Sequence, residues 1–181
     1  PKYAQFALMG IAGACFMGIF LALESYRLER LAIWRNPEKY EKGYQTLQGL
    51  YAIGSGGVFG VGIGNSVQKL GFVPEAQNDM IFSIICEELG LAGAGIIVFL
   101  FLLLIWRFFL IASGSRDLFG ALIATGAMAH MMTQVILNIA VVTNTIPNTG
   151  ITLPFISYGG TSVMFLLIEM GLVLSVSQVV D

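Results

Sequence analysis

Acidic side chains gather in one short stretch of the chain, PEAQNDMIFSIICEELG at residues 74–90, where a polar loop runs into an apolar segment. Four of the 11 acidic residues lie in it, namely Glu75, Asp79, Glu87 and Glu88. A charge beside a membrane segment is costly, so this concentration predicts a functional site. Glu75 and Asp79 are two carboxylates that invite a glycosidase interpretation; for Glu75 we favour a role in orienting the loop or sharing a metal ion over a second catalytic role. Glu87 and Glu88 are interpreted instead as acids that favour a helix N-terminus.

A glycine-rich tract, GSGGVFGVGIG at residues 54–64, is a second feature that could do chemistry. The backbone N–H groups of such loops can bind phosphate. This tract matches neither the P-loop nor the dinucleotide-binding fingerprint, and no βαβ pattern surrounds it. We favour a close-packed re-entrant turn, with phosphate binding as the alternative.

Polar residues also interrupt two of the apolar segments. His130, Thr133, Gln134 and Asn138 recur at helical spacing and share one face. This stripe predicts hydrogen bonds inside a helix bundle, with the lining of a cavity as the alternative. Glu169 lies near the middle of the last apolar segment, at a depth similar to that of His130. A pair between the two would serve either structure or proton transfer.

The composition identifies an integral membrane protein. Hydrophobic residues make up 56% of the 181 residues, charged residues make up 11%, and the mean hydropathy is +0.82. Soluble domains have about 25% charged residues. The formal net charge of −2 gives no reason to expect a nucleic-acid partner. Because the chain begins at Pro1 and runs almost at once into an apolar segment, we expect a fragment of a longer protein.

Apolar runs of about the ~20 residues that cross a bilayer divide this single membrane domain, 1–181, into spans and loops. The expected transmembrane helices are 3–23, 80–112, 118–142 and 160–180. They are connected by a large loop at 24–79, a short loop at 113–117 and a loop rich in proline and glycine at 143–159. Arg107 and Arg116 flank the short loop, which places it in the cytoplasm and the other two loops outside.

Two segments of the large loop favour short helices at the membrane interface. Residues 26–34 precede the turn signal Asn36-Pro37. Residues 43–53 carry apolar and aromatic side chains at helical spacing. The expected fold class is therefore an all-α polytopic membrane protein with four transmembrane helices and a large external loop that contains short interfacial helices.

Two blocks, GYQTLQGLYAIGSGGVFGVGIGNSVQKLGFVPEAQNDMIFSIICEELG and IPNTGITLPFISYGGTS, resemble the second half of the SEDS family. These are the shape, elongation, division and sporulation proteins typified by FtsW, RodA and SpoVE. The resemblance runs from about residue 43 to the end, and the NSVQK segment is most similar to the FtsW and SpoVE branch. It implies a multi-pass protein of the bacterial cytoplasmic (inner) membrane with a ten-helix bundle, of which this chain supplies the last four helices.

The resemblance further implies a peptidoglycan glycosyltransferase that polymerises lipid II into glycan strands. Its partners would be a class B penicillin-binding transpeptidase and other divisome or elongasome proteins in the lipid membrane. Asp79 matches the essential aspartate of the family's PE-x-x-x-D motif. Gln77 and Asn78 stand where the family often has His and Thr, so no role can be carried over from that histidine. Transfer with inversion requires a base for the acceptor 4-hydroxyl, which Asp79 would supply.

The departing pyrophosphate must also be stabilised. Lys69, an arginine outside this chain, or a divalent cation such as Mg²⁺ or Mn²⁺ would do this. The residues expected to contact substrate are polar groups of the two large loops and of the third span: Lys69, Glu75, Gln77, Gln134, Asn138 and Ser157.

Two functions of other classes stay open beside the enzyme. A transporter (flippase) of the lipid-linked precursor would use intramembrane polar groups such as Gln134, Asn138 and Glu169. A non-catalytic division scaffold would need no chemistry at Asp79. Cell division, elongation and sporulation are all compatible with the resemblance, and we expect the chain to be inactive without the rest of its protein.

Overall fold

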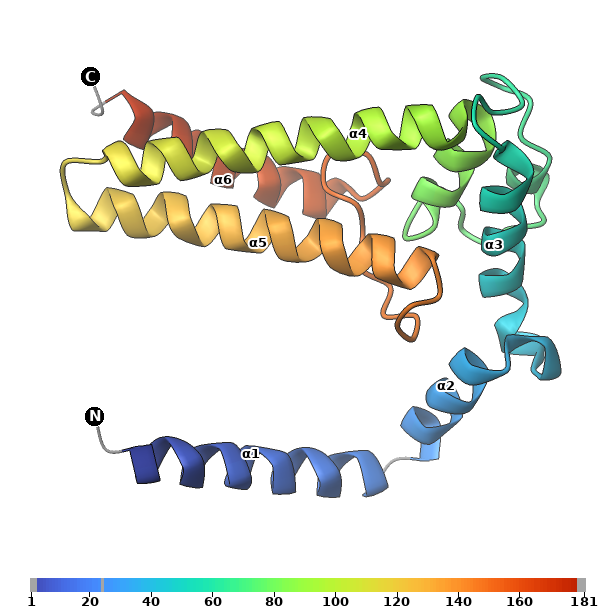
Figure 1. Cartoon of the computed structure of the whole chain (residues 1–181), viewed down its shortest axis with the longest axis horizontal. Helices are drawn as coiled ribbons and strands as arrows, with labels where there is room; N and C mark the ends of the chain where they lie inside the picture. The colour runs from blue at the N-terminus through green and yellow to red at the C-terminus, as the bar shows by residue number, and fades with distance from the viewer. Residues whose placement is uncertain (1–2, 24, 179–181) are drawn as a thin grey trace.

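The computed structural model describes residues 3–23 and 25–178, which form helices and loops without a β-strand in that part of the chain (Figure 1). The α-helices are α1 (Tyr3–Leu23), α2 (Ser25–Arg35), α3 (Tyr44–Gly56), α4 (Ile81–Gly114), α5 (Leu118–Val142) and α6 (Gly160–Ser177). Short 3-10 turns, η1 (Pro37–Lys39), η2 (Glu41–Gly43) and η3 (Gln68–Leu70), lie in the large loop. The all-α fold is confirmed. Residues 179–180 of the expected last span lie outside the described residues.

Helices α4, α5 and α6 pack together into a bundle (Figure 1). Its core consists of apolar side chains that all three helices contribute, among them Phe101, Phe108, Met131, Val135 and Val173. Inside a membrane, close van der Waals packing of such side chains holds the helices together, since lipid tails are as apolar as the side chains. The bundle therefore forms the rigid support of the loops at its ends.

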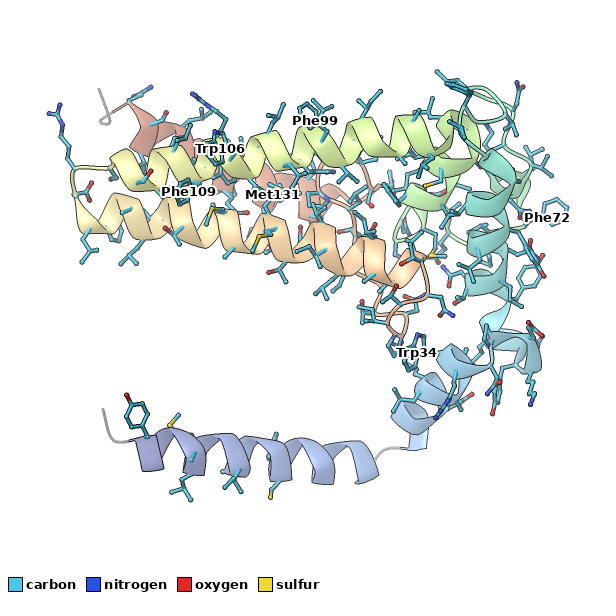
Figure 2. The ribbon with its side chains drawn as sticks, in the orientation of Figure 1. Trp34, Phe72, Phe99, Trp106, Phe109 and Met131 are labelled. Atoms are coloured by element: carbon cyan, nitrogen blue, oxygen red, sulfur yellow. The ribbon has the colours of Figure 1, made fainter. Side chains whose placement is uncertain are left out.

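The three bundle helices are each long and apolar enough to cross a membrane. Figure 2 shows Met131 between α4 and α5, whereas Phe99 points outward from α4 and is 57% exposed. Helix α1 has 21 residues and lies apart from the bundle, where it meets α2 (Figure 1). Its length suits a membrane span, and its assignment as the first of the four expected transmembrane helices stays a prediction.

The large loop folds into helices that cover one end of the bundle. Helix α2 ends at Arg35, directly before Asn36-Pro37, whose proline begins η1. Helix α3 crosses the end of the bundle (Figure 1) and packs against α4. Gly49 and Gly56 permit this approach, because a Cβ on them would overlap the Met80 side chain and the Cys86 carbonyl. Helices are therefore present at both segments where short interfacial helices were expected.

A break at Gly90 divides α4, and the glycine-rich tract folds against this break. Gly90 has φ 70° and ψ −172°, a conformation that is essentially restricted to glycine. The N–H groups of Val61 and Gly62 donate to the carbonyls of Glu87 and Glu88 at 2.9 and 3.0 Å. Because these N–H groups bond to the protein itself, the tract is a close-packed turn and these groups do not form a phosphate cradle.

Glu87 and Glu88 hold the following loop against α4. The Ser66 hydroxyl donates to Glu87, and the Val67 N–H donates to Oε1 of Glu87 at 3.1 Å. Nζ of Lys69 lies 2.6 Å from Oε1 of Glu88. The prediction that these two acids serve a helix N-terminus is wrong, since both lie well inside α4, just before its break.

The 143–159 loop contacts the large loop, which agrees with the prediction that both lie on the same side of the membrane. The indole N–H of Trp34 donates to the carbonyl of Asn144 at 2.9 Å. The N–H of Tyr158 donates to the carbonyl of Gln77 at 2.8 Å. These contacts gather polar segments from distant parts of the sequence at one end of the bundle.

Candidate active site

Asp79 lies in the loop immediately before α4, where three segments of the chain meet. The side-chain amide of Asn138, on α5, donates to the Asp79 carbonyl at 2.8 Å and to the Ile151 carbonyl at 2.7 Å. The amide of Gln45, on α3, donates to Oδ1 of Asp79 and to the Pro74 carbonyl, each at 3.3 Å. A buried amide therefore fixes the backbone of Asp79, and a second amide orients its carboxylate.

The Asp79 carboxyl has a pKa above its ordinary value. Burial is the main cause, and the negative charge of Glu75 raises the pKa further. Hydrogen bonds from its own backbone N–H and from the side chains of Asn148 and Gln45 act in the opposite direction. A carboxylate with a raised pKa is a stronger base than an exposed aspartate, which suits proton abstraction.

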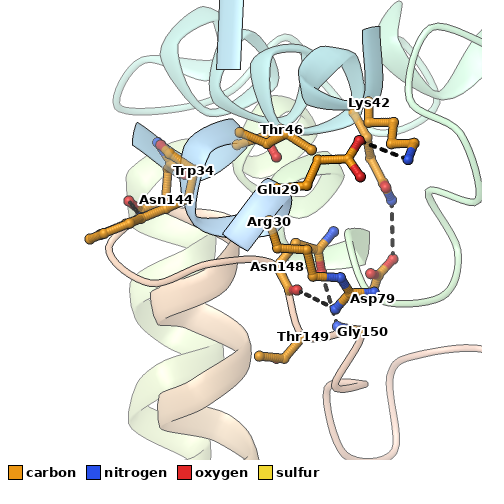
Figure 3. A pocket seen from close by; sticks show the side chains of 12 residues that line it. Glu29, Arg30, Trp34, Lys42, Thr46, Asp79, Asn144, Asn148, Thr149 and Gly150 are labelled. Carbon is orange, nitrogen blue, oxygen red and sulfur yellow. Dashed lines mark hydrogen bonds and ion pairs between the residues drawn. The ribbon is translucent and has the colours of Figure 1, made fainter. Parts of the chain in front are cut away.

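Two cavities meet at Asp79, and Figure 3 shows the first of them. The first has a volume of about 300 Å³ and lies among α2, α3 and the 143–159 loop, with Arg30, Lys42 and Asn148 in its lining. The second has a volume of about 610 Å³ and is lined by Glu75 and Tyr158 among others. Gln45 and Gly150 also line both cavities, so Asp79 lies at their junction.

Of the loop residues predicted to contact substrate, only Glu75 lines one of the two cavities at Asp79. Glu75 lines the second cavity, and its Oε2 accepts from the side-chain amide of Asn78 at 2.9 Å. Gln77 is exposed. Ser157 is buried and its hydroxyl accepts from the Leu153 N–H at 2.7 Å, so it shapes the 143–159 loop. Lys69 is paired with Glu88 and lines neither of the two cavities.

The polar residues of α5 have two different roles. Asn138 belongs to the site at Asp79, whereas His130 pairs with Glu169 on α6. Asn138 is fully buried beneath Asp79, as described above. Oε1 of Gln134 is buried and has no hydrogen-bond partner among the residues that the structure describes. Nδ1 of His130 lies 2.9 Å from Oε2 of Glu169. This confirms the expected pair, which joins α5 to α6.

Replacing Asn138 with Ala is expected to reduce both stability and activity. The change removes the donor of the Asp79 and Ile151 carbonyls, and each buried group left without a partner costs about 1–3 kcal/mol. We expect a lower melting temperature of the purified full-length protein and a lower rate in an assay of its activity. Thr133→Ala is the matched control on α5, since Thr133 is exposed and its hydroxyl donates to the Ala129 carbonyl of its own helix. Equal melting temperatures for the two variants would contradict the prediction.

Four residues of the site have no role in the sequence-based prediction: Arg30, Gln45, Asn148 and Tyr158. Each lines a cavity at Asp79. Arg30 is further positioned by donation from its Nη1 to the Asn148 carbonyl at 3.0 Å. The only signal for Arg30 in the sequence is its place in a short helix expected at the membrane interface, where anionic headgroups are found.

The FtsW/RodA/SpoVE family of cell cycle proteins matches residues 2–181. The chain belongs to this family. Stage V sporulation protein E of Bacillus subtilis (strain 168) is 44% identical over 180 residues, which cover 98% of this chain and 49% of the relative. A probable peptidoglycan glycosyltransferase FtsW of Coxiella burnetii is 43% identical over 175 residues, covering 94% and 46%. The chain spans about half the length of the curated relatives it matches.

Solved structures place this SEDS chain in the same fold. A chain from a study of how a peptidoglycan synthase complex coordinates polymerization and crosslinking has a TM-score of 0.77 and 28% identity, and the match covers 98% of this chain and 49% of that chain. A crystal structure of a mutant of the rod shape determining protein RodA from Thermus thermophilus has a TM-score of 0.56 and 34% identity, covering 72% and 39%.

Proposed function

We propose that the full-length protein is a peptidoglycan glycosyltransferase that joins lipid II units into glycan strands, with Asp79 as the general base. The observation that carries the proposal is the geometry of Asp79, a half-buried carboxylate with a raised pKa at the junction of two cavities. Membership of the family supports it, because several relatives are named probable peptidoglycan glycosyltransferases.

The proposed reaction uses Asp79 to take the proton of the acceptor 4-hydroxyl. The hydroxyl oxygen then forms a bond to the anomeric carbon of the donor, and the bond from that carbon to the phosphate oxygen breaks with inversion. The electron pair leaves with undecaprenyl pyrophosphate, and the proton on Asp79 passes to water. Asn138 and Gln45 act as positioning residues that hold the base in place.

We further propose the bacterial cytoplasmic membrane as the location and a class B penicillin-binding transpeptidase as a partner. Three apolar helices of membrane-spanning length support the first proposal. The likeness to a chain of a peptidoglycan synthase complex that couples polymerization with crosslinking supports the second.

A divalent cation is a further proposed participant, and it would come with the substrate. In residues 3–23 and 25–178, no group of three or more Asp, Glu, His or Cys side chains is placed to hold a metal ion. Mg²⁺ is commonly bound by one or two carboxylates together with substrate phosphates, which Asp79 and Glu75 could provide beside a bound pyrophosphate. The chemistry it would supply is charge neutralisation at the leaving group.

The test is the polymerisation of labelled lipid II by the full-length protein in proteoliposomes with its transpeptidase partner, alongside an assay of precursor translocation. The glycosyltransferase proposal predicts that Asp79→Ala abolishes polymer formation. A transporter would instead lose translocation when Gln134 or Glu169 is replaced. Polymer formed equally by Asp79→Ala and the wild type would refute the role of Asp79 as base.

Two substitutions beside Asp79 are expected to shift the acid limb of the pH profile in opposite directions, which tests Asp79 as the base. Glu75→Gln removes a charge that raises the pKa of Asp79, so the rise of kcat/KM with pH is expected at lower pH. Gln45→Met removes a hydrogen bond that lowers this pKa, so the rise is expected at higher pH. Shifts in the same direction for both variants, or no shift, would mean that Asp79 does not control the profile.

A further inference from the structure

The second cavity at Asp79 has the lining of a site for an uncharged polar ligand. Its wall carries the carboxylates of Glu75 and Asp79, and no lysine or arginine among the described residues lines it. Amide and hydroxyl side chains complete the polar part of the lining, namely Gln45, Asn78, Thr152 and Tyr158. Such groups donate to and accept from ligand hydroxyls, whereas the two carboxylates disfavour an anion. The cavity therefore suits a ligand that is rich in hydroxyl groups and has no negative charge.

The side chain of Tyr158 offers this cavity an aromatic surface. Tyr158 is 75% exposed, so its ring is open to a ligand. Its backbone is fixed, because its N–H donates at 2.8 Å to the carbonyl of Gln77, two residues before Asp79. Sugar rings have faces of C–H groups that pack on aromatic rings, and ligand sites commonly combine an aromatic surface with a few convergent polar groups. An exposed ring that is held beside carboxylate, amide and hydroxyl groups is typical of a sugar subsite.

Two segments that line the second cavity each contain a non-glycine residue with a left-handed backbone. Glu75 has φ 49° in the loop before α4, and Phe155 has φ 62° three residues before Tyr158. A residue with a Cβ adopts this region at a cost in free energy. The turn at Phe155 is held by Ser157, whose N–H donates to the Leu153 carbonyl at 3.0 Å and whose hydroxyl accepts from the Leu153 N–H at 2.7 Å. Backbone strain is concentrated at ligand-binding sites, which agrees with a functional role for this cavity.

We propose that the second cavity binds the acceptor sugar, with Tyr158 as the surface on which the ring stacks and Glu75 as an acceptor for its hydroxyls. This inference rests on the proposed function, in which Asp79 takes the proton of the acceptor 4-hydroxyl. Asp79 lines the same cavity as Tyr158, so a sugar on that ring lies in the space that the base borders. The donor sugar carries pyrophosphate on its anomeric carbon, so the two carboxylates favour the acceptor over the donor here.

Glu75 is oriented for this role by its neighbour Asn78. The side-chain amide of Asn78 donates to Oε2 of Glu75 at 2.9 Å. A carboxylate has about four acceptor positions, so this contact is compatible with further hydrogen bonds from sugar hydroxyls. Hydrogen bonds to an ionised acceptor are also stronger than those between neutral groups.

The experiment measures binding of methyl N-acetylglucosaminide, a neutral sugar with a free 4-hydroxyl, to the full-length protein in nanodiscs by saturation-transfer NMR. Tyr158→Ala removes the stacking surface and is expected to bind this sugar about fivefold more weakly. Tyr158→Phe keeps the ring and should bind within about twofold of the wild type. Both variants keep the contact with Gln77, because that contact uses the backbone N–H.

A matched anionic probe tests the charge of the cavity. The same glycoside with a carboxylate in place of its C6 hydroxymethyl group should bind to the wild type more weakly than the neutral sugar, because Glu75 and Asp79 repel it. Glu75→Gln removes one of these charges, so the difference between the two probes should narrow. It should also weaken binding of the neutral sugar, since the charged acceptor is lost.

Tyr51→Ala is the matched control, since Tyr51 is a 58% exposed tyrosine of α3 that lines neither cavity. It should bind the neutral sugar as the wild type does. In polymerisation assays, Tyr158→Ala is expected to raise KM for lipid II and to leave kcat within about twofold of the wild type. A residue that binds the sugar without taking part in proton transfer affects the two constants in this way.

The inference is overturned if Tyr158→Ala binds the neutral sugar as tightly as the wild type, if Tyr51→Ala is weakened equally, or if the wild type binds no sugar. Tighter binding of the anionic probe by the wild type, a comparison that needs no variant, also overturns it. Because binding requires no turnover, Tyr158-dependent binding with unchanged polymerisation by Asp79→Asn would refute the proposed function alone. Binding that does not depend on Tyr158, with polymerisation lost in Asp79→Asn, would refute only the sugar subsite.

Discussion

Asp79→Asn in the full-length protein is expected to slow lipid II polymerisation by about 10²–10⁴-fold, the usual contribution of a general base. The amide has the size of the carboxylate and can still accept from Gln45, so the architecture of the site is kept while the proton acceptor is lost. The measurement is the initial rate of glycan-strand formation with the transpeptidase partner present, with binding of that partner checked separately.

The same substitution is expected to leave stability unchanged or to raise it. Burial raises the pKa of Asp79 in the folded state above its ordinary value. An acid whose pKa is raised by folding destabilises the folded state as the pH rises above its ordinary pKa, because the unfolded chain ionises more readily. Asn carries no charge, so its melting temperature at pH 7 should equal or exceed that of the wild type.

Glu38→Gln is the control for the loss of one negative charge from the large loop. Glu38 is exposed in η1 and lines neither cavity at Asp79. It should polymerise at the wild-type rate. A tenfold loss in this variant, or a rate for Asp79→Asn close to that of the wild type, would mean that overall charge and not a base at Asp79 determines the activity.

The helices could be predicted from the sequence because hydropathy and helix-ending residues are local signals. The apolar runs correspond to α1, α4, α5 and α6, and the turn at Asn36-Pro37 correctly separates α2 from the following turns. Asp79 could also be predicted from the sequence, because the PE-x-x-x-D motif places an acid at a fixed offset from its proline and glutamate. Each of these signals lies within about 20 adjacent residues.

The remainder of the candidate site could not be predicted in this way, since it depends on contacts between distant segments. Arg30, Gln45 and Asn148 come from three separate elements and meet only when the large loop folds over the end of the bundle. Lys69 is close to Asp79 in sequence, yet it pairs with Glu88, which lies just before the break in α4. Periodic patterns in the sequence do not predict which of these distant residues contact one another.

Gly90→Ala is expected to destabilise the protein by about 2–6 kcal/mol, the sum of about 1–3 kcal/mol of backbone strain and about 1–3 kcal/mol of overpacking. With φ 70° and ψ −172°, Gly90 has a conformation that a residue with a Cβ adopts only under strain. A Cβ there would also overlap the backbone of Gly60 and Val58, whose segment crosses the break. Since backbone atoms cannot move aside as a flexible side chain can, the glycine-rich tract would be displaced from α4.

This displacement should reach the site, because α4 begins directly after Asp79 and Met80. We expect a lower melting temperature of purified Gly90→Ala and reduced polymerisation even below that temperature. Gly95→Ala on the same helix is the matched control, since a Cβ at Gly95 has no neighbour within 4 Å among the described residues. Alanine there should be tolerated or slightly stabilising, because it favours the helix by about 1 kcal/mol over glycine. Equal loss of stability in both variants would show that α4 is sensitive to any added methyl group, and that the break at Gly90 has no special role.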